Sequence, residues 1–324
     1  MRATFFDKIY FLISYCVSSR ENREYDLLAQ SSSLGVRMKH ERFIVKPGKK
    51  VHLTDYDPGF IGSYTDKEQA KPKLEEDIQQ MTEYQDVLYA QGKYAVLIIL
   101  QAMDAAGKDS IIKHVMSGVN PQGCDVYSFK APSTEELKHD YLWRSNKALP
   151  ARGKIGIFNR SYYEEVLVVR VHPEFLATEN IPDSHNAKKM WPRRFEEINE
   201  FERYATNNGI AVLKFFLNVS KDEQKKRFLE RIDTPEKNWK FSIHDVEERG
   251  HWDDYVRAYE DVFSNTSTEW APWYIIPADN KWYTRVAVAD VIVSKMKSLK
   301  MSYPTVSEAH KRELLRVKKI LERE

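Results

Sequence analysis

Residues 94–110 read YAVLIILQAMDAAGKDS, and this stretch decides the fold. Its first seven residues form a continuous apolar run preceded by Gly92, which predicts a strand buried on both faces of a sheet. The following residues are small, they end in Gly107 and Lys108, and a helical pattern begins at Ser110. A strand, a loop of small residues and a helix in this order predict an α/β domain with the loop at the carboxyl edge of its sheet.

Similar short apolar runs recur along the chain and alternate with helical patterns. The runs lie at 126–129, 155–158, 210–217 and 273–276, and the helical patterns lie at 110–116, 134–145, 189–205, 222–231 and 245–263. A further helix of about twenty residues, ending at Gly92, precedes the first strand. This alternation predicts a parallel sheet that helices cover on both faces.

The loop at 102–110 has the features of a phosphate-binding loop. Such a loop needs small residues that let backbone N–H groups face phosphate oxygens, a helix N-terminus, and a lysine for the terminal phosphates. The match to G-x-x-x-x-G-K-[ST] is imperfect, because Ala102 replaces the first glycine and Asp109 replaces the hydroxyl residue. The alternative is an ordinary turn with an exposed lysine at Lys108. The order of strand, small residues and helix favours phosphate binding.

Asp104 lies inside this loop, where a carboxylate would repel phosphate unless a cation or a proton made it useful. Mg²⁺ takes oxygen ligands and shares substrate phosphates, so Asp104 is a candidate metal ligand, or a group that positions the attacking phosphate oxygen. The alternative is a simple helix cap.

A second group of polar residues follows the run at 155–158. Asn159 stands where many phosphate-loop enzymes carry a magnesium-binding aspartate, and Arg160 offers a bidentate grip on phosphate. Because ligands bind at the carboxyl ends of parallel strands, we expect this group to lie beside Lys108. Glu164 and Glu165 are candidates for orienting a nucleotide or its metal, although glutamates at a helix start are often only dipole partners.

A basic segment lies at 214–240. It holds eight Lys and Arg against five Asp and Glu, a local charge of +3, whereas the whole chain carries +2. Arg227 and Arg231 are four residues apart, so on a helix they share one face, and their two guanidinium groups could bind a chain of phosphates between them. Pro235 and the following Lys240 suggest a lid, which we place at about 221–250. The alternative is a charged surface helix.

The composition excludes several classes of protein. A net charge of +2 argues against a nucleic-acid coat, and the two cysteines, Cys16 and Cys124, fit a reducing compartment, so we expect a cytoplasmic protein. The apolar residues at 9–17 are too short to span a bilayer, and no small-residue cleavage pattern follows them, so we expect no signal and no membrane anchor.

We expect residues 1–37 to be a disordered extension, residues 38–303 to form the domain, and residues 304–324 to form a C-terminal helix.

Several ordered blocks of the sequence resemble the family-2 polyphosphate kinases. They are MDAAGKD (103–109), GVNPQG (118–123), SFKAPS (128–133), DYLWR (140–144), FNRSYYEEVLVVRV (158–171), LKFFL (213–217), WKF (239–241) and APWY (271–274). The resemblance spans about residues 40–300, and the glutamate pair at 164 and 165 is similar to the subgroup that accepts both AMP and ADP.

This resemblance implies reversible, Mg²⁺-dependent phosphoryl transfer between inorganic polyphosphate and nucleoside mono- or diphosphates. It also implies a three-layer α/β fold similar to thymidylate kinase, with a parallel sheet and a helical lid. The implied catalytic residues are Asp104, Lys108, Asn159 and Arg160, with Asp104 also the metal ligand. The implied nucleotide-binding residues are Ala105, Gly107, Glu164, Arg227 and Arg231. The implied polyphosphate-binding residues are Lys108, Lys130, Arg160, Arg194 and Lys240.

The expected partners are polyphosphate, AMP, ADP and ATP, with guanine nucleotides left open, and neither nucleic acid nor membrane. We also expect a homo-oligomer, either a dimer or a tetramer. Two other functions compete with this hypothesis. One is a nucleoside monophosphate kinase that uses ATP as donor, and the other is a polyanion- or nucleic-acid-binding module built on the basic lid.

Overall fold

The structure is a computed structural model that describes residues 40–179, 181 and 187–324. The extension expected at residues 1–37 lies outside the described residues. Five parallel strands form one sheet in the order β2-β3-β1-β4-β5. The strands are β1 (Ala95–Ala102), β2 (Cys124–Ser128), β3 (Ile155–Asn159), β4 (Ile210–Asn218) and β5 (Trp273–Pro277).

The central strand carries the predicted loop. β1 is buried along nearly its whole length and pairs with β3 on one side and β4 on the other. In this register Leu100 lies level with Asn159, so the loop after β1 and the polar residues after β3 leave the sheet side by side. The five predicted strands are confirmed, and β2 is an edge strand with Val126 and Tyr127 exposed.

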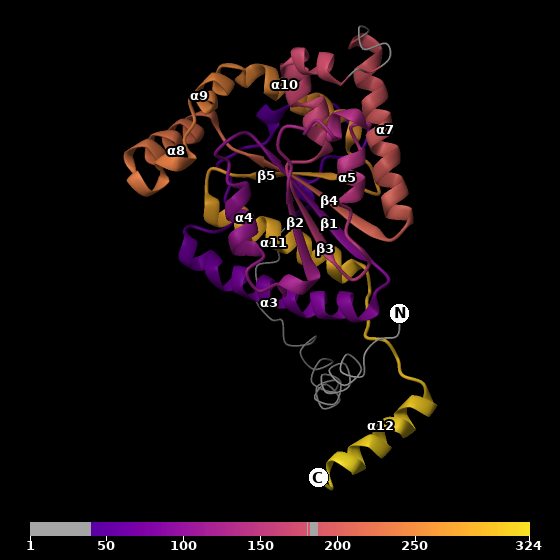
Figure 1. Cartoon of the computed structure of the whole chain (residues 1–324). Coiled ribbons are helices and arrows are strands. Elements are labelled where there is room, and N and C mark those ends of the chain that lie inside the picture. The colour runs from indigo at the N-terminus through magenta and orange to yellow at the C-terminus, as the bar shows by residue number, and fades with distance from the viewer. Residues whose placement is uncertain (1–39, 180, 182–186) are drawn as a thin grey trace. The chain divides into compact units, whose positions relative to one another are not determined.

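Helices cover both faces of the sheet (Figure 1). On one face lie α3 (Lys67–Gln91), α4 (Lys108–Val115) and α11 (Lys281–Ser298), and on the other lie α7 (Ala187–Asn207) and α10 (Trp252–Thr266). The α/β prediction is therefore confirmed. The sequence patterns do not predict α11, because its buried residues surround the whole helix and leave no polar face to read.

Two predicted helices are wrong in extent. The pattern at 134–145 forms η4 (Glu136–Lys138) and α5 (Trp143–Lys147), because Asp140 accepts from the backbone N–H of Leu142 and starts a new turn. The pattern at 245–263 is divided into α9 (Ile243–Gly250) and α10, with the break at His251.

Shorter elements complete the described chain. Ser220 caps the N-terminus of α8 (Lys221–Asp233), where its hydroxyl accepts from the N–H of Glu223, and Ser307 caps α12 (Glu308–Leu321) in the same way. The remaining elements are η1 (His40–Phe43), η2 (Leu53–Asp55), η3 (Pro121–Gly123), η5 (Tyr162–Val166), α6 (Val168–Val171), η6 (Pro173–Thr178) and η7 (Pro235–Lys240). Among the described residues, no helix is long and apolar enough to cross a membrane.

Candidate active site

The loop between β1 and α4 has the backbone shape of an anion cradle. Ala105 has φ +61° and Gly107 has φ +116°, so two residues of this short loop adopt the left-handed region. Alternation of right- and left-handed residues turns N–H groups inward into a concave nest. The left-handed conformation costs a residue with a Cβ, such as Ala105, on the order of 1 kcal/mol, and such strain is concentrated at functional sites.

Lys108 begins α4 and folds back over the loop. Its Nζ donates to the carbonyl of Ala102 at 3.0 Å. Burial lowers the pKa of Lys108, the positive charge of Arg160 lowers it further, and the carboxylates of Asp104, Glu164 and Asp109 oppose this shift. The ammonium group therefore lies within the electrostatic reach of the residues that follow β3.

Arg160 connects the loop to β3. Its Nη2 donates to Asp104 Oδ1 at 3.1 Å, and its Nη1 lies 3.4 Å from Glu164 Oε2. The charge of Glu164 is the largest cause of a raised pKa for Arg160. Gln101, buried at the end of β1, donates from Nε2 to Glu164 Oε1 at 3.0 Å and fixes that carboxylate. The structure thus brings Asp104, Lys108, Arg160 and Glu164 to one place, and their roles remain predictions.

The two residues that depart from the usual phosphate-loop pattern contact each other. Asn159 Nδ2 donates to Asp109 Oδ1 at 2.9 Å. The usual pattern has an uncharged hydroxyl on the loop and a carboxylate on the neighbouring strand. Here the carboxylate is on the loop side and the uncharged amide is on the strand, so the site still has one carboxylate at this position.

A cavity of about 460 Å³ adjoins the loop. Asp104, Arg160 and Glu164 line it together with residues of α9 and α10. The lining residues of these two helices are His244, Asp245, Glu248, Arg249, Trp252, Tyr255 and Tyr259. The segment predicted as a lid therefore shares a cleft with the loop.

The two predicted lid arginines occupy different environments. Arg231 pairs with Asp245 at 3.4 Å, beside the cleft. Arg227 is buried and donates to the carbonyls of Ala105 and Ala106 instead. The expectation that both arginines present one cationic face to phosphate is wrong for Arg227, because its guanidinium is taken up by the backbone of the loop.

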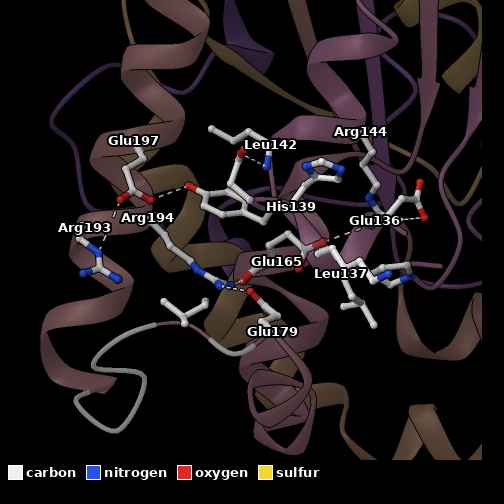
Figure 2. A pocket seen from close by; sticks show the side chains of 15 residues that line it. Glu136, Leu137, His139, Leu142, Arg144, Glu165, Glu179, Arg193, Arg194 and Glu197 are labelled. Carbon is white, nitrogen blue, oxygen red and sulfur yellow. Dashed lines mark hydrogen bonds and ion pairs between the residues drawn. The ribbon is translucent and has the colours of Figure 1, made fainter. Parts of the chain in front are cut away.

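Another predicted anion contact, Arg194, lines a second cavity of about 650 Å³ (Figure 2). There Arg194 Nη1 donates to the carbonyl of Glu165 at 2.6 Å, and Arg144 Nη2 donates to Glu165 Oε1 at 3.1 Å. Burial, together with the charge of Glu179, raises the pKa of Glu165 to about 7. The 3₁₀ helix η5 sends Glu164 to the first cavity and Glu165 to the second. The structure does not bring Arg194 to the phosphate loop.

The last two predicted polyphosphate contacts lie elsewhere or outside the described side chains. Lys130 lines a shallow hollow with Tyr127, Phe129 and Trp143, and its carbonyl accepts from Arg144 Nη1 at 2.8 Å. Lys240 ends η7, and its side chain lies outside the described part of the chain.

The sequence did not indicate Gln101 and Gln224, which donate hydrogen bonds to Glu164 and to the loop. Gln224 is buried on α8, and its Nε2 donates to the carbonyl of Asp104 at 3.0 Å. A polar residue at the carboxyl end of an apolar strand is a usable signal for Gln101. Gln224 has no such signal, because it is one polar residue among many on a charged helix.

The oxygen atoms near the loop suit a magnesium ion that shares its coordination with a substrate. Asp104 and Asp109 offer carboxylates and Asn159 offers an amide oxygen, which are ligands that Mg²⁺ prefers. Within the described residues, no group of three or more His, Cys, Asp or Glu could hold a metal ion by itself. This donor set fits a cation held by one or two carboxylates together with substrate phosphates.

The left-handed residues of the loop after the central strand, with Lys108 folded over it and Arg160 beside it, are typical of a phosphotransferase. Residues 64–304 match the family described as Polyphosphate kinase 2 (PPK2). The chain therefore belongs to the polyphosphate kinase 2 family, and the predicted resemblance is confirmed.

Individual relatives cover nearly the whole described domain. The chain is 51% identical over 287 residues to an ADP-polyphosphate phosphotransferase of Rhodopseudomonas palustris, covering 88% of this chain and 99% of that protein. It is 43% identical over 265 residues to an AMP/ADP-polyphosphate phosphotransferase of Meiothermus ruber, covering 82% and 95%. The crystal structure of Polyphosphate Kinase 2 from Arthrobacter aurescens superposes with a TM-score of 0.78 at 39% identity, covering 87% and 98%.

Proposed function

We propose that the cleft above the loop transfers the terminal phosphoryl group of inorganic polyphosphate to AMP or ADP, reversibly and with Mg²⁺. The observation that carries the proposal is the convergence of Asp104, Lys108 and Arg160 on a loop with the backbone of an anion cradle. The relatives add support, since that from R. palustris is named for ADP and that from M. ruber for both AMP and ADP.

The reaction needs positioning and charge neutralisation more than covalent chemistry on the protein. A phosphoryl group moves through a loose, in-line transition state with charge on its equatorial oxygens. The amides of Ala105 and Gly107 and the ammonium of Lys108 would hold one phosphate, and Arg160 would hold its neighbour bidentately. Bound Mg²⁺ would supply further neutralisation of phosphate oxygens beside Asp104.

Two arginines at the cleft, Arg160 and Arg231, form ion pairs with carboxylates, and we take these pairs as the state of the cleft before substrate binds. Arg160 lies between Asp104 and Glu164, and Arg231 lies against Asp245. An arriving phosphate chain competes for the same guanidinium groups, and the segment at 221–250 is proposed to act as the lid that closes on it. Glu164 is proposed to act on the nucleotide side, and Lys130, Arg194 and Lys240 remain proposals for longer phosphate chains.

Product analysis by chromatography tests the proposal directly. Purified protein is incubated with long-chain polyphosphate, Mg²⁺ and either AMP, ADP, GMP or GDP, without ATP. ADP and ATP are the expected products from the adenine nucleotides. Transfer to AMP from ATP but not from polyphosphate would instead support an ATP-dependent nucleoside monophosphate kinase.

Assembly and location complete the proposal. The exposed apolar residues Leu315, Ile320 and Leu321 of α12 support a homo-oligomer, a dimer or tetramer, which light scattering on the purified protein measures. The small number of cysteines supports a cytoplasmic location.

A further inference from the structure

One face of α8 lies beneath the loop and contacts three of its carbonyl groups in succession. Gln224 donates to the carbonyl of Asp104 at 3.0 Å. One turn later, Arg227 Nη1 donates to the carbonyl of Ala105 at 3.0 Å and to that of Ala106 at 2.8 Å. Both side chains are buried, so water has little access to their donor atoms.

The hydrogen bonds to these carbonyl groups fix the directions of the neighbouring backbone N–H groups of the loop. In a planar trans peptide the carbonyl of one residue and the N–H of the next point in opposite directions. The N–H of Ala106 closes a turn onto the carbonyl of Met103 at 3.3 Å. Within the described residues, the N–H groups of Ala105 and Gly107 donate to no protein acceptor. These two amides are turned away from α8 and are available to an anion.

Arg227 uses every N–H donor of its guanidinium for contacts within the protein. Its Nε donates to Glu223 at 2.9 Å, and its Nη2 donates to the carbonyls of Ala278 and Asp279 at 2.6 and 2.9 Å. With the two bonds from Nη1, all five N–H donors of the guanidinium are used. Arg227 therefore ties the loop after β1 to the segment after β5 and has no donor left for a ligand.

We propose that Gln224 and Arg227 are positioning residues of this phosphotransferase, which act by turning the amides of Ala105 and Gly107 toward the phosphates. This inference rests on the proposed function. It assigns Arg227 a role through the backbone of the loop, in place of the direct nucleotide contact expected from the sequence.

Gln224 also connects the loop to α9. Its Oε1 accepts from Arg249 Nη1 of α9 at 2.9 Å, while its Nε2 holds Asp104. The variant Gln224→Glu keeps an acceptor for Arg249 but places an oxygen against the carbonyl oxygen of Asp104. This single change separates the two contacts, and it preserves the size of the side chain.

The test uses the full-length protein and inorganic tripolyphosphate as the probe. For Gln224→Glu we expect the dissociation constant of tripolyphosphate to rise roughly threefold to tenfold, since one part-buried hydrogen bond is lost and a carboxylate is added beside the loop. We also expect kcat/KM to fall by a similar factor and hydrogen exchange to accelerate in the peptide covering residues 103–108. Lys225→Ala, on the exposed face of the same helix, is the matched control for any change in Tm.

Wild-type binding and turnover by Gln224→Glu would overturn the proposal, and so would a loss of Tm without a change in tripolyphosphate affinity. Arg227→Lys provides a second measurement, because one ammonium group cannot hold four carbonyls and a carboxylate at once. We expect it to weaken tripolyphosphate binding more than Gln224→Glu does, and an unchanged affinity would contradict the proposal. Failure of the wild-type protein to use polyphosphate would refute the proposed function, whereas the tripolyphosphate measurement does not depend on turnover.

Discussion

Exchanging the charges of Asp109 and Asn159 tests whether their contact holds the loop to β3. In Asn159→Asp, two carboxylates face each other across the 2.9 Å that now separates Asn159 Nδ2 from Asp109 Oδ1. Two unit charges at this distance repel by about 1.4 kcal/mol at a dielectric constant near 80 and by about 6 kcal/mol near 20. Because Asp109 is exposed, the lower figure applies, and the lost hydrogen bond adds about 1 kcal/mol.

The double variant Asp109→Asn with Asn159→Asp restores one donor and one acceptor with their positions reversed. We therefore expect Asn159→Asp to lower the free energy of unfolding by roughly 2 kcal/mol, and the double variant to recover most of that loss. The assay is urea unfolding of the wild type, both single variants and the double variant, with EDTA present so that no cation bridges the carboxylates. An equal effect of Asn159→Asp with aspartate or asparagine at position 109 would refute the reasoning.

Three further predictions concern the phosphate cleft and the second cavity. Lys108→Ala and Asp104→Ala should each abolish phosphoryl transfer while circular dichroism shows an intact fold, and normal turnover by either variant would remove its assigned role. Arg231→Ala should raise the KM for polyphosphate several-fold, since a guanidinium beside the cleft is lost; an unchanged rate at every substrate concentration would discard the lid assignment. Burial raises the pKa of Glu165 from 4.5 to about 7, so the folded chain binds this proton more tightly than the unfolded chain. The free energy of unfolding should therefore fall, by up to roughly 3 kcal/mol, as pH rises from about 4.5 to about 7, and should then level off. Glu165→Gln should flatten this dependence in urea titrations, and an equally steep dependence in the variant would contradict it.

The strands and the loop were predictable because their signals are local. A buried parallel strand needs a continuous apolar run, and a phosphate loop needs small residues before a helix, so 94–110 reveals both. The placement of Arg160 beside the loop also followed, since parallel strands end at the same edge of the sheet. The sequence did not predict α11, because this helix is buried on all sides and therefore lacks the polar face by which an amphipathic helix is recognised.

The sequence by itself therefore determined the type of sheet, the place of the loop and the residue types gathered at its edge. Only the tertiary structure decided that Arg227 lies beneath the loop, that Asn159 contacts Asp109, and that Glu164 and Glu165 face different cavities. The physical reason is that periodicity tells which side chains share an element, whereas a side chain's partner depends on atoms from distant parts of the chain. For Arg227 those partners are mostly backbone carbonyls, which every residue type carries and which leave no mark in the sequence.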